Sequence, residues 1–104
     1  MSAEGKEIWN LEVDKSGVIW IIGEIDYTIA SKLRKELFPR LEATSDDVAF
    51  NLSRLTYLDS SGLALLIEIN RKLHEKGRKM IISEITPDVK KVFDLTQVAR
   101  LFGV

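Results

Sequence analysis

The segment with the clearest chemical potential is residues 58–62, LDSSG, which joins an apolar run to a helical pattern. Asp59 and Ser60 are residue types whose side-chain oxygens accept the free N–H groups at a helix start, so the segment can be a purely structural cap. The same position exposes a serine hydroxyl near the positive end of a helix, where a phosphate is tolerated. Phosphorylation there would add about −1.5 to −2 charges beside Asp59. The residues alone leave both interpretations open.

A second polar group, GEID at residues 23–26, follows another apolar run. Asp26 or Thr28 can cap the helix expected after it. If the two apolar runs are strands of one sheet, their C-terminal ends meet at the same edge, and Asp26 lies beside Ser60. Two carboxylates next to a hydroxyl could orient it, bind Mg²⁺ together with a nucleotide, or repel a phosphate and keep it labile.

The strands that would position these residues show two kinds of pattern. Residues 8–13 alternate between apolar and polar side chains, and a turn at residues 14–17 connects them to a continuous apolar run at 18–22. We therefore expect a hairpin whose second strand is buried on both faces. Trp9 and Trp20 are expected in the core. Two further apolar runs are expected to form strands, at residues 48–52 and 80–82.

Helical patterns follow these strands. Apolar residues recur at helical spacing over residues 29–37, and Pro39 is expected to end or kink this helix. A second helix is expected over residues 63–76, and a third begins with Thr86 as its cap and Pro87 at its first position. Strands that alternate with helices after a hairpin indicate an α/β fold. We expect a mixed sheet, with an N-terminal hairpin and then parallel strands, and with helices packed on it.

The helix expected at residues 63–76 has an apolar arc wider than a single stripe. Leu65 and Ile69 lie at the flank of this arc, shortly after Ser60. They are either core residues or part of an exposed surface that docks a partner. The residues expected on the buried face itself are Leu63, Leu66, Ile67 and Leu73.

Composition argues against several classes of function. The chain has 104 residues, 45% of them hydrophobic and 30% charged, so we expect one globular domain over residues 1–104. A formal net charge of −1 gives no drive toward nucleic acid or anionic lipid, and no apolar run approaches the roughly 20 residues of a membrane helix. The absence of cysteine and a single histidine, His74, argue against thiolate and imidazole metal sites. Without nucleotide-binding or nucleophile motifs, we expect a cytoplasmic, cofactor-free protein that is not an enzyme.

Three segments, in this order along the chain, carry a family resemblance: GEIDYTIASKL, FNLSRLTYLDSSGLALLIEI and TPDVKKVFDLTQVARLF. Together they resemble the STAS domain of bacterial anti-sigma-factor antagonists over nearly the whole chain. The combination of LDSSGL with an upstream GEID is fairly specific, whereas either motif alone would be weak. The resemblance implies a STAS-type sheet and a small cytoplasmic binding protein.

In that family, the unphosphorylated protein binds an anti-sigma factor that is also an ATP-dependent serine kinase, and a sigma factor is released. The kinase inactivates the antagonist on the serine after the motif's aspartate, and a serine phosphatase restores it. The resemblance implies that Ser60 accepts the phosphate, with Asp59 and Asp26 as acidic neighbours. Ser61 takes the family's second hydroxyl position, and Gly62 is the glycine that opens the helix. We expect a monomer.

Two other functions stay open. The chain could be a STAS interaction module of another signalling or lipid-transport complex, with no role in sigma-factor control. It could also be a nucleotide hydrolase that uses Asp26 and Asp59. Capture of partners from a lysate separates the first from an antagonist, and turnover of GTP or ATP that is abolished by Asp59→Asn would identify the second.

Overall fold

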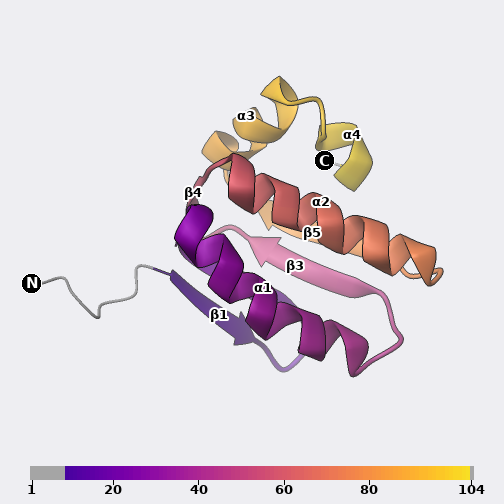
Figure 1. Ribbon diagram of the computed structural model, residues 1–104. Helices are drawn as coiled ribbons and strands as arrows, with labels where there is room; N and C mark the ends of the chain where they lie inside the picture. Colours follow the sequence, from indigo (N-terminus) through magenta and orange to yellow (C-terminus); the bar gives the residue numbers. More distant parts are fainter. Residues whose placement is uncertain (1–8, 104) are drawn as a thin grey trace, which may run out of the picture.

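The computed structural model describes residues 9–103 (Figure 1). Ile8, which the sequence pattern assigns to the first strand, lies outside the described residues. Strands come first and then alternate with helices. The elements are β1 (Trp9–Val13), β2 (Ile19–Ile25), α1 (Tyr27–Glu42), β3 (Val48–Leu52), β4 (Leu55–Leu58), α2 (Ser60–Glu75), β5 (Met80–Ile85), α3 (Pro87–Leu95) and α4 (Ala99–Phe102).

The strands form one mixed sheet, which confirms the predicted fold class. β1 and β2 pair antiparallel, and the later strands pair parallel, β3 and β4 with β2 and β5 with β3. β3 joins β2 at Ile19 and Trp20, and β4 joins it farther along, up to Ile25. A turn at Ser53 and Arg54 separates β3 from β4. The sequence pattern does not predict β4 as a strand of its own.

The core lies between the sheet and two helices. α1 and α2 lie side by side across one face of the sheet (Figure 1). Burial of a large apolar side chain contributes about 1.5–3 kcal/mol. The layer of apolar side chains between the sheet and these two helices therefore contributes most of the stabilising free energy. The least exposed side chains of the layer include Ile21, Ile25, Leu33, Leu37, Phe50, Leu52, Leu66 and Ile69.

The prediction that β2 is buried on both faces is wrong. Trp20 and Ile22 alternate with the fully buried isoleucines of β2 and are only half-buried, because α1 and α2 cover the opposite face. The indole N–H of Trp20 donates to Asp14 Oδ2 (2.9 Å), and this hydrogen bond lowers the pKa of the Asp14 carboxyl. Trp9, on the edge strand β1, is also only half-buried, so neither tryptophan is a core residue.

The sequence pattern predicts that α1 ends or kinks at Pro39. The helix does not end there but continues to Glu42. Proline removes one backbone donor from a helix. Leu37 and Leu41 lie on either side of Pro39 in the chain, and both are buried against the core. Packing of these leucines therefore holds the last turn of α1 despite the proline.

The loop after α1 is fixed by Arg78, whose side chain is buried with 6% exposure. Its guanidinium donates to the carbonyl of Leu41 (2.8 Å), the carbonyl of Asp46 (2.7 Å) and Oγ1 of Thr44 (3.0 Å). The Leu41 carbonyl belongs to the C-terminal end of α1, where the helix dipole favours a positive charge. Arg78 thus joins the end of α1, the following loop and the start of β5.

The start of α3 agrees with the sequence prediction. Thr86 Oγ1 accepts the N–H of Val89 (3.2 Å), and Pro87 is the first residue of the helix. Val89 and Phe93 are buried, and the Phe93 ring lies 5.2 Å from that of Phe102 in α4. This ring contact joins α3 to α4.

Candidate functional site

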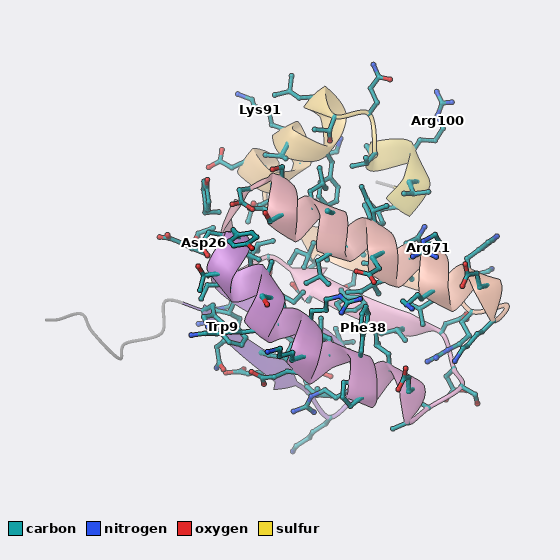
Figure 2. All side chains as sticks on the ribbon, in the orientation of Figure 1. Trp9, Asp26, Phe38, Arg71, Lys91 and Arg100 are labelled. Carbon is teal, nitrogen blue, oxygen red and sulfur yellow. The ribbon has the colours of Figure 1, made fainter. Side chains whose placement is uncertain are left out.

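The two polar motifs meet where β2 and β4 end. Ile25 and Leu58 are paired residues of these parallel strands, and the N–H of Asp59 donates to the carbonyl of Ile25 (3.2 Å). Asp26 and Asp59 therefore follow neighbouring strand ends, and α1 and α2 start there side by side. Figure 2 shows Asp26 at this end of α1.

Each of the two carboxylates caps a helix. Oδ1 of Asp26 accepts the N–H of Ile29 (3.0 Å) at the start of α1. Oδ1 of Asp59 accepts the N–H groups of Ser61 (2.9 Å) and Gly62 (3.1 Å) at the start of α2. Both caps have an extended backbone, as the residue before a helix normally has. Of the two candidates for the α1 cap, Asp26 and Thr28, it is Asp26 that serves.

Ser60 is the first residue of α2, and it is exposed. Ser61 is only half-buried, and its N–H is already bound by Asp59. A phosphate on Ser60 would find two N–H groups of the first turn, those of Ser61 and Gly62, already bound by Asp59. It would instead extend from the surface beside a carboxylate.

Gly62 lies where the first turn of α2 packs against the ends of β2 and β4. A Cβ atom at this position would overlap Cδ1 of Leu58 and would lie 2.9 Å from Cγ2 and 3.3 Å from the carbonyl oxygen of Ile25. Only glycine lets the first turn of α2 rest on the ends of β2 and β4. This contact places Ser60 directly above the two strand ends.

A sequence profile of the STAS domain matches residues 9–104. The chain belongs to the STAS family. Among its relatives, the anti-sigma-B factor antagonist of Staphylococcus epidermidis is 28% identical over 82 residues, which are 79% of this chain and 76% of the relative.

Two solved structures share the STAS fold. An anti-sigma factor antagonist from Mycobacterium paratuberculosis is 22% identical, with a TM-score of 0.73, over 90% of this chain and 80% of the other. The Bacillus cell fate determinant SpoIIAA, solved in its phosphorylated form, is 24% identical, with a TM-score of 0.65, over 88% of this chain and 86% of the other. At these identities the likeness establishes the fold.

The interpretation of Leu65 and Ile69 as an exposed docking flank is wrong for this STAS domain. Leu65 is 4% exposed and Ile69 is fully buried, and Leu63 is buried as well. α2 packs against α1 as well as against β4 and β5, so its wide apolar arc is covered by two layers. Leu65 and Ile69 are therefore core residues, and only the small exposed part of Leu65 reaches the surface, in a groove between α1 and α2.

Two exposed tyrosines lie close to the site in the sequence and were not expected there. Tyr27 follows the Asp26 cap and is 75% exposed, and Tyr57 precedes Leu58 in β4 and is 50% exposed. Tyrosine is enriched in protein interfaces because it combines a large apolar ring with a hydroxyl. Tyr57 could have been identified from the sequence, because it directly precedes the LDSSG motif and neighbours the apolar Leu58, so its side chain points to the other face of the strand.

Neither a metal centre nor a membrane span is found among residues 9–103. No group of three or more His, Cys, Asp or Glu side chains in this range is arranged to hold a metal ion. No helix in the same range has the length and apolar character needed to cross a bilayer. His74 lies on the surface of α2.

Replacement of Asp59 should separate its capping role from its charge. Asp59→Ala removes the acceptor for two N–H groups, and we expect the free energy of unfolding to fall by about 0.5–2 kcal/mol. Asp59→Asn keeps an equally good capping oxygen, so its stability should stay close to that of the wild type. Urea denaturation of the three proteins measures the difference, and an equal loss in both variants would contradict the capping role.

Proposed function

We propose that this STAS protein is an anti-sigma-factor antagonist that is switched by phosphorylation of Ser60. In the unphosphorylated state it binds an anti-sigma factor that is also an ATP-dependent serine kinase, and a sigma factor is released. The observation that carries the proposal is the exposed Ser60, which directly follows Asp59 where the ends of β2 and β4 meet. The activity named for the staphylococcal relative supports the same function.

The switch follows from charge at the surface. A phosphate on Ser60 would add about −1.5 to −2 charges next to Asp59, at the sheet edge where Asp26 follows the neighbouring strand. Because Asp59 accepts the N–H groups of Ser61 and Gly62, the phosphate would have to compete with Asp59 for these two donors. Its charge and bulk therefore face the partner, and binding is lost while the fold is retained.

The proposal also covers the location of the protein, its oligomeric state and the removal of the phosphate. The protein acts in the cytoplasm as a monomeric single STAS domain over residues 1–104, and a serine phosphatase restores the unphosphorylated form. It binds rather than turns over a substrate. The helix-capping hydrogen bonds of Asp26 and Asp59 support this, because a nucleotide hydrolase would use the same carboxylates for its chemistry.

Incubation with the kinase-type anti-sigma factor and Mg·ATP should add one phosphate per chain, measured by intact mass spectrometry. Ser60→Ala should accept none, and Ser61→Ala should still accept one, which peptide mapping places at Ser60. Efficient phosphorylation of the Ser60→Ala protein would sink the assignment.

A further inference from the structure

A groove runs between α1 and α2 from the Ser60 end of the molecule. Its volume is about 340 Å³. Small side chains on both helices leave this space open, since Ala30 and Ser31 of α1 face Ser61 and Ala64 of α2 across it. Leu65 lies at its base and Tyr27 at its mouth. We call this feature the interhelical groove.

An ion pair between α1 and α2 lines part of the interhelical groove. Arg34 of α1 donates to Glu68 of α2 in two parallel hydrogen bonds, Nε to Oε1 (3.1 Å) and Nη2 to Oε2 (2.6 Å). The guanidinium also lies 4.7 Å from the centre of the Phe38 ring, which Figure 2 shows on α1. Side-by-side hydrogen bonding and stacking hold the Arg34 plane in one orientation, while its Nη1 group is not used by Glu68.

The interhelical groove is continuous with the Ser60 site. Ser61, which lines the groove, is the next residue in the chain, and Tyr27 directly follows Asp26. A partner that covers Ser60 with an interface of ordinary size, about 800 Å² on each side, extends over the mouth of the groove. The Tyr27 ring is 75% exposed at that mouth, and exposed aromatic rings of this kind are common anchors of protein interfaces.

From these contacts we infer that the interhelical groove receives one apolar side chain of the anti-sigma factor bound at Ser60. This inference rests on the proposed function. The apolar side chain contacts Leu65 and the methyl groups of Ala30 and Ala64. A carbonyl or carboxylate beside it accepts a hydrogen bond from Nη1 of Arg34, whose side chain is 50% exposed. The groove thus supplies a second anchor that phosphorylation of Ser60 does not alter.

Blocking the interhelical groove tests the inference. Ala64 is exposed, so Ala64→Arg should fold normally and fill the groove; His74→Arg places the same side chain on an exposed site of α2 about ten residues away. Isothermal titration with the purified anti-sigma factor that phosphorylates Ser60 should show at least about tenfold weaker binding for Ala64→Arg. The affinity of His74→Arg should stay within about twofold of wild type. Ser31→Arg, from the opposite wall, should reproduce the loss.

The outcomes separate the groove from the switch. Ser60→Glu, titrated in the same way, should abolish binding if the proposed function holds. Loss of binding in Ser60→Glu together with unchanged affinity in Ala64→Arg and Ser31→Arg would overturn the groove and leave the switch intact. Wild-type affinity in Ser60→Glu would overturn the proposed function, and the inference with it.

Discussion

Arg78→Ala should lower the free energy of unfolding by about 3–5 kcal/mol, because it removes a buried cation with three hydrogen bonds. The carbonyls of Leu41 and Asp46 and the hydroxyl of Thr44 all lose their donor. A domain of this size is stable by only about 5–15 kcal/mol, so the loss is a large share of the total. Chemical denaturation of the purified variant measures it.

Two further substitutions show whether burial of Arg78 is the cause. Arg71 is exposed and pairs with Glu75 one turn later, and Arg71→Ala should change stability by less than about 0.5 kcal/mol. Arg78→Lys keeps the charge, but a single ammonium does not match three acceptors spread around a planar guanidinium, so it should recover only part of the loss. Stability of Arg78→Ala equal to that of Arg71→Ala would contradict the buried anchor.

Gly62→Val should be the most damaging single change at the candidate site, with a loss of about 2–4 kcal/mol. The first atom of any side chain at this position overlaps Leu58 and lies 2.9 Å from Cγ2 of Ile25. Both neighbours are buried, so a shift of either side chain disturbs the core packing around it. Gly62→Ala should cost less, because alanine favours a helix over glycine by about 1 kcal/mol and partly offsets the overlap.

The effect of Gly62→Val should extend to function. Ile25 and Leu58 immediately precede Asp26 and Asp59, so a displaced α2 also displaces both caps and Ser60. Under the proposed function, phosphorylation of Ser60 should be slower in this variant, even at temperatures where the variant is folded. Ala64→Val, on the exposed side of the same helix, is the matched control for stability. Comparable stability of the two valine variants, in thermal melts followed by circular dichroism, would refute the close contact at Gly62.

Apart from β4, the order of strands and helices was predictable from periodicity, and so was the meeting of the two polar motifs. Parallel strands bring their C-terminal ends to one edge, so GEID and LDSSG could be placed together before any coordinates were known. The pairing of Ile25 with Leu58 realises this arrangement. What periodicity does not report is how many neighbours a helix has. Leu65 and Ile69 are apolar in either case, and only the packing of α1 against α2 buries them.

Arg78 and Pro39 show the same limit in two other ways. A buried arginine and a surface arginine look alike in the stretch KGRK, because burial depends on one carbonyl at the end of α1 and one in the loop after it, 37 and 32 residues away. Pro39 has a strong local preference against a helix interior, yet the buried leucines on either side of it outweigh that preference. In both cases tertiary contacts decide what the local sequence leaves open.

The Asp59 cap has a consequence for the kinetics of the proposed switch. Because the N–H groups of Ser61 and Gly62 are already bound to Asp59, a phosphate added to Ser60 can leave these hydrogen bonds and the first turn of α2 in place. If the switch works as proposed, it then needs no slow rearrangement of the helix start between modification and its effect on the partner. Its speed would follow the rates at which the phosphate is added and removed.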